Sequence, residues 1–492
     1  MKMRKYISYI TIAIGLLSFV SCEEWLDEKP QTDLPAEDLF ETENGFMSSL
    51  AGLYIRMTEE EVYGKNLTFG LVDQLAQMYD RIPDGANNRS SIYIYDQETN
   101  GGYNTKGTLA NLWQEQYHII ANANNLLKWL DLNGEAVLSD SLQNMMRGEA
   151  LAIRAYLHFD LLRGWGPMNY AKDAKAQEMK CIPYRTVADN SKQPLLTAKT
   201  VVEKIIADLD SAKKLLSYEK DLDLSSHNSG DRHYRFNYHA VNATLARVHN
   251  YAGNKEKAKA CALDVIENSG RYLLDENNND PVLSKEVICG LSIHEMEDNL
   301  SEYFAEGDKI ETKNYINLST RDKLFETSGI DSEDMRAKSS AFIINNTMQV
   351  AMSLKYIDND NEIIPLIRLP EMYYIACESS EGEDAAFYVN SVRNKRGISR
   401  SKDVQCDSEE KIIEALNKEY RKEFYAEGQY FWYLKTHGLT GTLEHNDETT
   451  LVEENFIFPL PDREKEFGWT IEETPDSEEN TENEEQDDNT GI

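Results

Sequence analysis

Residues 146–167 read MRGEALAIRAYLHFDLLRGWGP, and this stretch decides the fold class. Its apolar side chains recur every three or four residues, at Met146, Ala150, Ile153, Leu157 and Leu161. This spacing places them on one face of an α-helix, which turns once in about 3.6 residues. Gly164 and Pro167 then end the helix, because neither residue favours its continuation. The stretch therefore predicts an amphipathic helix that packs against a neighbour.

Helices of the same kind surround this stretch and arrive in pairs. An earlier helix over residues 113–130 is closed by Gly134, and the motif Thr200-Val-Val-Glu203 forms a capping box that opens a third helix. Further pairs are expected at 238–251 with 256–266, at 371–380 with 385–395, and at 409–426 with 429–435. The alternation resembles tetratricopeptide helix hairpins, although no strict repeat of about 34 residues appears. We therefore expect an all-α scaffold of stacked helix hairpins.

Two long, polar and aromatic-rich insertions interrupt the hairpins, over residues 79–106 and 277–353. Loops of this length are uncommon in compact domains unless they are functional or disordered, and their aromatic content disfavours disorder. We therefore expect a ligand surface of irregular loops carried on the helical scaffold.

The first insertion has the side chains that sugar binding requires. Flat aromatic faces stack on the sugar ring, and polar groups beside them reach its hydroxyls. The candidates are Tyr93, Tyr95 and Tyr103, with Asp80, Arg81, Arg89, Asn100 and Asn104. Further candidates in the second insertion are Tyr303, Phe304 and Tyr315. Alternatively, these aromatic residues cover the apolar surface of the scaffold itself.

The N-terminus has the features of a bacterial lipoprotein signal. Lys2, Arg4 and Lys5 precede an apolar stretch from Tyr6 to Val20, which is too short for a permanent membrane span. Cys22 follows a small residue and is the expected first residue of the mature chain, acylated on its thiol and its freed amine. Several acyl chains give a nearly permanent anchor, because each buried methylene contributes about 0.8 kcal/mol. The alternative is an ordinary signal peptide with a chance cysteine.

The chain of 492 residues is strongly acidic, with a formal net charge of -35. The tail over residues 471–492 has almost no apolar side chains, and we expect it to be disordered. No basic stripe is present to bind nucleic acid. Besides Cys22 the cysteines are odd in number and form no CxxC pair, so we expect neither a disulfide framework nor a metal site, and no other cofactor.

Short sequence blocks are spread over nearly the whole chain after the signal. They lie at residues 22–30, 40–46, 50–54, 112–124, 147–167, 206–209, 368–373, 392–397, 423–428 and 458–461. Among them are Arg147-Gly-Glu-Ala150, Arg368-Leu-Pro-Glu-Met-Tyr373 and Glu423-Phe-Tyr-Ala-Glu-Gly428. Each block is common by itself, but their joint order is specific. In this order they resemble the SusD/RagB family of nutrient-binding lipoproteins from Bacteroidetes.

The resemblance implies a signal peptide at 1–21, a SusD-like nutrient-binding domain at 22–470 and the acidic tail at 471–492. Within the domain it implies an N-terminal part at about 22–230 and a C-terminal SusD/RagB part at about 270–470. It also implies a lipoprotein on the outer membrane, facing the extracellular side. Such a protein binds an oligosaccharide, or in some members a peptide, and closes over a SusC-type TonB-dependent transporter for import. Ligand residues vary within the family, so the resemblance does not identify the ligand.

Catalytic motifs give no support for an enzyme. His294-Glu295 lacks the second histidine of a metalloprotease helix, and no G-x-S-x-G elbow appears. The segment 96–101 resembles the start of a calcium loop, but its twelfth position is Gly107 and we interpret it as a polar turn. A surface glycosidase with paired carboxylates stays an alternative, as does a purely structural lid on the transporter.

The charged residues of the blocks predict structure. Arg147, Glu149 and Arg154 lie on the helix predicted within residues 146–167, and we expect them to form ion pairs between hairpins. Glu423, Glu427 and Gly428 are expected to mark a helix end, with Gly428 as its C-cap.

Overall fold

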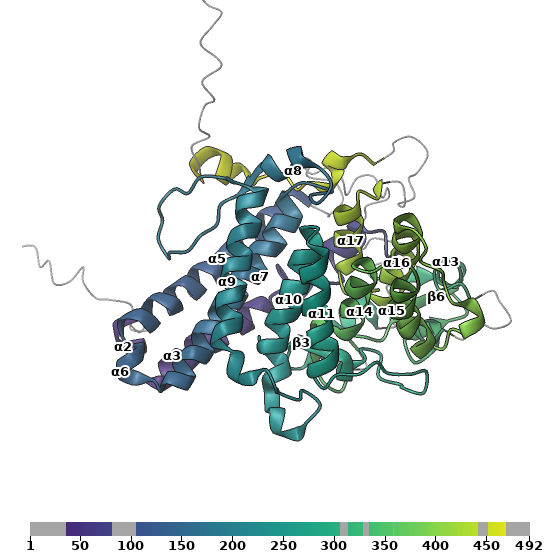
Figure 1. Cartoon of the computed structure of the whole chain (residues 1–492), viewed down its shortest axis with the longest axis horizontal. Coiled ribbons are helices and arrows are strands. Elements are labelled where there is room, and N and C mark those ends of the chain that lie inside the picture. Colours follow the sequence, from purple (N-terminus) through teal and green to yellow (C-terminus); the bar gives the residue numbers. More distant parts are fainter. Residues whose placement is uncertain are drawn as a thin grey trace, which may run out of the picture. The chain divides into compact units, whose positions relative to one another are not determined.

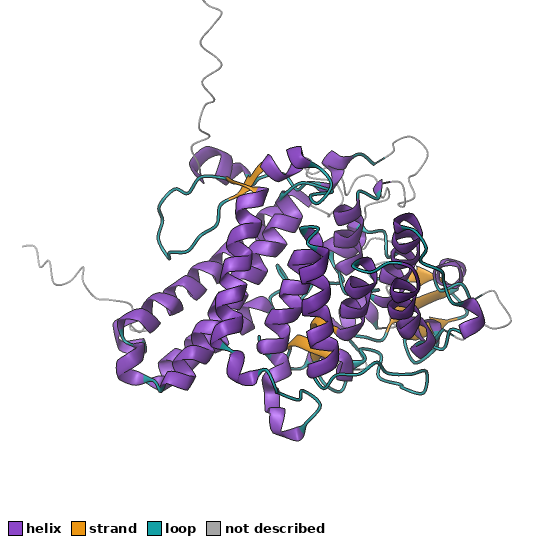
Figure 2. Cartoon of the chain, viewed as in Figure 1, coloured by secondary structure: helices purple, strands orange, loops and turns teal. Residues whose placement is uncertain are grey.

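Helices dominate the chain and its strands are short (Figure 2). The computed structural model describes residues 36–80, 105–305, 313–327, 334–357, 359–440 and 451–468. The chain divides into two units, residues 1–48 and 49–492. The all-α prediction is confirmed. The predicted signal peptide and acidic tail lie outside the described residues.

The helices of the second unit form a continuous row in which each contacts the next (Figure 1). In order along the row they are α5 (Thr105–Leu132), α7 (Asp140–Trp165), α9 (Ala198–Leu215), α10 (Tyr238–Tyr251), α11 (Lys255–Asn268), α14 (Leu369–Glu378), α15 (Gly382–Lys395), α16 (Glu409–Glu423) and α17 (Gln429–His437). Alanines on α10 are fully buried, which lets neighbouring helices approach closely. The row is the predicted hairpin scaffold.

Helix α7 contains residues 146–165 of the stretch that decides the fold class. Every residue from Ala152 to Trp165 is buried, so the helix is covered on all sides and not only on its apolar face. Polar side chains on its other faces therefore need partners inside the protein. Asp160 accepts hydrogen bonds from Arg163 and from the Tyr63 hydroxyl, for example.

Further elements complete the fold. The other helices are α2 (Ala36–Leu39), α3 (Glu43–Met57), α4 (Leu71–Leu75), α6 (Gly134–Val137), α8 (Ala174–Glu178), α12 (Met296–Phe304) and α13 (Leu318–Leu324). Short 3₁₀ turns lie at Ser217–Glu219, Ser284–Glu286, Met335–Ala337, Arg400–Lys402 and Glu453–Phe456. His227–Tyr234 contains 3₁₀ turns on both sides of a kink, and Glu464–Gly468 forms a π-helical turn. The antiparallel sheets pair β1 (Lys180–Ile182) with β2 (Leu196–Thr197), β3 (Val287–Ser292) with β7 (Ile363–Arg368), and β6 (Val350–Ser353) with both β4 (Ile316–Asn317) and β5 (Phe342–Asn345). The second insertion is therefore partly regular, with strands too short to give a visible period.

Two predicted caps were wrong. Helix α9 is capped by Thr197, whose hydroxyl accepts from the Thr200 backbone N–H, so Thr200 lies inside the first turn. Thr197 ends β2 in an extended conformation, which is the geometry an N-cap needs. Gly428 precedes α17 as its N-cap and does not close α16. Its φ of 74° and the close approach of the Leu67 carbonyl explain why glycine stands there.

The remaining sequence predictions concern cysteines and membrane spans. Cys181, Cys261, Cys289, Cys377 and Cys406 are free thiols. In the part of the chain that the structure describes, no three or more His, Cys, Asp or Glu side chains gather as metal ligands would. None of the helices within the described ranges has the length and apolar character needed to cross a membrane.

Candidate ligand-binding site

Of the ligand-binding candidates in the first insertion, only Asp80 can be placed. Tyr93, Tyr95, Tyr103, Arg81, Arg89, Asn100 and Asn104 lie outside the described residues, as does the lipidation site Cys22. Their roles stay predictions. Asp80 lies at the last described position before this gap.

Asp80 joins the edge of the first insertion to the second. Its backbone N–H donates to the Tyr315 carbonyl at 3.0 Å. Its carboxylate accepts from the Asn317 backbone N–H at 2.5 Å and from the Thr320 hydroxyl at 3.1 Å. These partners lie at the beginning of α13, where a carboxylate is favoured because the first N–H groups of a helix have no partner within it. Asp80, the described edge of the first insertion, is therefore fixed to the second insertion.

The aromatic candidates of the second insertion divide into two kinds. Phe304 is fully buried and packs on Phe69 and Tyr356, with ring centroids 5.1 and 5.4 Å away, so it belongs to the core. Tyr303 is half-buried, and its hydroxyl accepts from Lys65 Nζ at 2.9 Å. Tyr315 is also half-buried and uses its carbonyl to hold Asp80. Tyr303 and Tyr315 thus keep exposed area that a ligand could contact.

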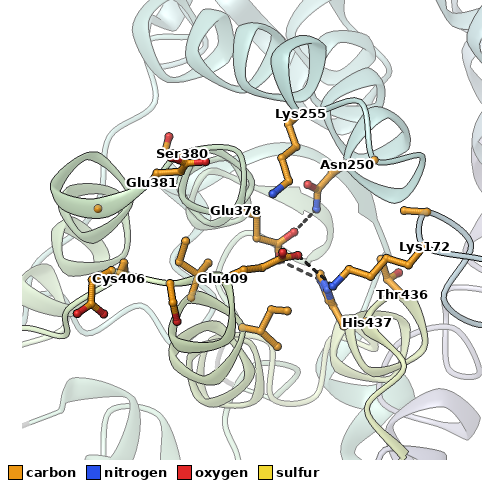
Figure 3. Close-up of a pocket in the computed structure, with 17 residues that line it drawn as sticks. Lys172, Asn250, Lys255, Glu378, Ser380, Glu381, Cys406, Glu409, Thr436 and His437 are labelled. Carbon is orange, nitrogen blue, oxygen red and sulfur yellow. Dashed lines mark hydrogen bonds and ion pairs between the residues drawn. The ribbon is translucent and has the colours of Figure 1, made fainter.

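A second polar site lies between the ends of α10, α14 and α17 and the beginning of α16. It encloses a cavity of ≈ 290 Å³ (Figure 3). Glu378 accepts a hydrogen bond from the Asn250 amide, and its other oxygen lies 3.2 Å from His437 Nε2. Lys172 pairs with Glu409 at 3.0 Å and holds the pKa of Glu409 below its ordinary value.

No sequence pattern indicates this cavity, because it forms only where the ends of several helices meet. Lys172 and Glu409 form an ion pair in its wall, and Glu378 lies beside His437. Because its lining comes from the ends of neighbouring helices, we interpret the cavity as a junction between hairpins.

Charged residues of the C-terminal sequence blocks form buried ion pairs, which the sequence did not predict. At the α14–α16 end of the row, Arg396 donates to Glu286 at 2.7 Å and to Glu423 at 2.8 Å. Arg368 donates to Glu423 and to Glu427, both at 2.8 Å. Burial raises the pKa of Glu423, but Arg396 and Arg368 outweigh it and hold this pKa well below the ordinary value.

The charged residues of the block on α7 also form ion pairs. Its members pair as Arg147 with Asp131, Glu149 with Arg232 and Arg235, and Arg154 with Asp208. Arg147 connects α7 to α5 and Arg154 connects α7 to α9, so these pairs hold neighbouring helices together. The prediction that the blocks are structural is confirmed for these residues.

Comparison with protein families identifies the chain in two overlapping parts. Residues 24–249 match a SusD-like family described as "Starch-binding associating with outer membrane". Residues 234–488, just over half of the chain, match the SusD family.

Individual relatives and solved structures agree. The chain is 28% identical over 277 residues to SusD-like protein P2 of Formosa agariphila, covering 55% of this chain and 48% of that protein. It therefore spans about half the length of the curated relatives it matches. A SusD superfamily structure from Bacteroides thetaiotaomicron superposes with a TM-score of 0.68 at 23% identity, covering 86% of this chain and 98% of that one.

A further neighbour carries a ligand. Surface glycan-binding protein A from Bacteroides thetaiotaomicron, in complex with laminarihexaose, superposes with a TM-score of 0.62 at 15% identity, covering 86% of this chain and 97% of that one. At such identities the superpositions show a shared fold, whereas the family matches assign membership. The chain belongs to the SusD family.

Proposed function

We propose that this protein is a cell-surface lipoprotein of the outer membrane that binds a nutrient oligosaccharide and delivers it to a SusC-type TonB-dependent transporter. It acts by capture and handover, without chemistry on the ligand. Shape, aromatic stacking and hydrogen bonds supply the affinity.

The link through Asp80 is the observation that carries the proposal. It holds the edge of the tyrosine-rich first insertion against Asn317 and Thr320 of the second. A ligand surface made from both insertions is therefore anchored to the rigid helical row, as binding loops usually are. The laminarihexaose complex of a neighbour with the same fold supports a glycan as the ligand class.

Cys22 supplies the location in this proposal. An acylated Cys22 keeps the protein beside the transporter and raises its effective concentration there. A Cys22→Ala variant should bind ligand in solution as the native protein does, yet disappear from the cell surface. Surface labelling of whole cells measures the second effect. Normal surface display of this variant would exclude the lipid anchor.

Titration calorimetry with glycan and peptide mixtures tests the ligand class. We expect neutral oligosaccharides to bind in the micromolar to millimolar range, and the triple variant Tyr93→Ala, Tyr95→Ala, Tyr103→Ala to lose that binding and uptake together. Tyr218→Ala, which removes a tyrosine that is 53% exposed and lies far along the chain from both insertions, is the matched control.

Each alternative has its own outcome in this experiment. Heat released only with peptides would assign a peptide ligand. Normal uptake by the triple variant would indicate a purely structural lid. Release of shortened sugars by the purified protein, abolished by a single carboxylate substitution, would indicate a glycosidase.

A further inference from the structure

A large open groove lies on the helical row, and none of its described lining residues belongs to either insertion. Its walls come from α14 and α15, from the segment 271–276 that follows α11, and from the loop 397–405. Figure 1 shows α11, α14 and α15 side by side. The groove has a volume of ≈ 1350 Å³, more than the roughly 300–1,000 Å³ typical of sites for small molecules. An extended ligand fits such a volume better than a single sugar does.

Aromatic side chains are exposed in this groove. Tyr272 is 51% exposed and Phe387 is 64% exposed, and both line it together with the half-buried Tyr373. Tyr388 contacts two of these rings, since its ring centroid lies 5.3 Å from that of Phe387 and 6.4 Å from that of Tyr373. Single exposed aromatics are ordinary, but several around one hollow indicate a binding surface.

Polar atoms in the groove walls lack hydrogen bonds. Arg271 Nε, Asn394 Oδ1 and Asp403 Oδ1 are buried atoms that find no hydrogen-bond partner among the described residues. Arg271 is only 9% exposed, and its Nη1 makes one long contact to the Lys285 carbonyl at 3.5 Å. Burial lowers the pKa of Arg271 to about 10, although the nearby Asp223 acts in the opposite direction. Buried groups in this state are rare in proteins, and each needs an explanation.

The chemistry of these three atoms selects the occupant. Arg271 Nε is a donor, whereas Asn394 Oδ1 and Asp403 Oδ1 are acceptors. A hydroxyl group both donates and accepts, so a polyhydroxylated ligand matches all three. The exposed rings offer flat faces for the C–H surfaces of such a ligand.

We propose that this groove is a second carbohydrate site, which binds a neutral oligosaccharide chain independently of the two insertions. The groove wall carries the cations Arg271, Lys395 and Arg400 beside the carboxylates Asp275, Glu276, Glu383 and Asp403, so a strongly charged ligand of either sign would meet repulsion. A neutral sugar chain meets no such repulsion.

Hydrogen exchange measured by mass spectrometry tests this site locally. The full chain is incubated with millimolar maltohexaose, laminarihexaose, mannohexaose or xylohexaose. We expect at least one of them to slow exchange in peptides covering 271–276 and 397–405. The double variant Tyr272→Ala, Phe387→Ala should lose this protection, with affinity falling by roughly three- to tenfold for each ring removed.

Controls separate this site from the insertions and from a protein interface. Tyr218→Ala should keep the protection, and so should the triple variant of Tyr93, Tyr95 and Tyr103. Both substitutions of the double variant Tyr272→Ala, Phe387→Ala lie at the surface, and thermal unfolding verifies that this variant folds. Absence of protection with all four sugars would overturn the proposal, as would protection that survives the double variant. Protection that appears only on raising the protein concentration, or on adding the transporter, would assign the face to a protein interface and would also overturn it.

Discussion

Arg396 and Arg271 are both buried arginines, yet their surroundings are opposite. Arg396 is fully buried and donates to two carboxylates, Glu286 and Glu423. Arg271 is 9% exposed and has no ion pair among the described residues. Arg396 belongs to a sequence block that identifies the family, whereas Arg271 lies outside all the blocks. The difference indicates that Arg396 holds the fold together, whereas Arg271 is available to the oligosaccharide that we propose for the groove.

The largest expected effect comes from Arg396→Leu. Its loss leaves Glu286 and Glu423 buried with less compensating charge, and breaking a buried pair from one side costs about 3–5 kcal/mol. Urea unfolding should show a decrease of that size. The control Arg147→Leu removes a surface ion pair with Asp131 and should cost at most about 1 kcal/mol. Similar decreases in the free energy of unfolding in both variants would show that the buried ion pairs of Arg396 contribute no more than a surface ion pair.

The second prediction concerns the pH dependence of stability. His158 is stacked on Tyr184; its Nδ1 donates to the Arg154 carbonyl and its Nε2 accepts from the Arg185 N–H. Burial lowers the pKa of His158 to about 3, with Arg154 and Arg185 adding repulsion. Because the folded pKa lies below the unfolded value, this stabilisation is complete above about pH 6.5 and decreases as the pH falls toward 3.

Each pH unit below the unfolded pKa of histidine removes about 1.36 kcal/mol of this stabilisation. As the pH falls from 6.5 to 5, His158 should therefore lower the free energy of unfolding by about 2 kcal/mol. In His158→Phe, which keeps an aromatic ring beside Tyr184, this part of the pH slope should vanish. His294→Phe, whose native side chain is 88% exposed, should keep the native slope. An unchanged slope in His158→Phe would mean that another group titrates.

A smaller effect is expected from Asp80→Ala. The variant removes the acceptor for the Asn317 N–H and the Thr320 hydroxyl, and losing a cap of this kind costs about 1 kcal/mol. Hydrogen exchange in α13 should accelerate, and oligosaccharide affinity should decrease because the two insertions are no longer joined. The exposed Glu135→Ala is the control. Unchanged exchange in α13 would contradict the role of Asp80 as a link.

More of the fold than of the site could be predicted, because each helix is determined mainly by residues that are close together in the sequence. Helix α10 runs from Tyr238 to Tyr251 as expected, since Asn237 caps its beginning and Gly253 turns the chain after its end. The cap of α9 was placed wrongly because the conformation of Thr197 depends on strand pairing with β1. Hydrophobic period determines a helix, whereas its first residue depends on neighbours from elsewhere in the chain.

The candidate site depends on contacts between distant residues. Asp80 was predicted as a ligand residue from the composition of the first insertion. Its carboxylate instead accepts a hydrogen bond from the backbone N–H of Asn317, 237 positions later in the chain. Phe304 was a candidate because it lies in a polar insertion, and only the packing of Phe69 and Tyr356 shows that it is core. Arg271 gave no sequence signal, because an incomplete set of hydrogen bonds is visible only in three dimensions.

The smallest expected effect tests the comparison most directly. Arg271→Leu removes a buried charge that forms no ion pair among the described residues, and its aliphatic replacement keeps the contacts of the side-chain stem. The free energy of unfolding should therefore change by less than about 1 kcal/mol, or should increase, in contrast to Arg396→Leu. Affinity for the hexasaccharide that protects the groove should nevertheless fall, because one donor is lost. A loss of stability as large as that of Arg396→Leu would show that Arg271 also serves the fold, and the distinction between the two arginines would fail.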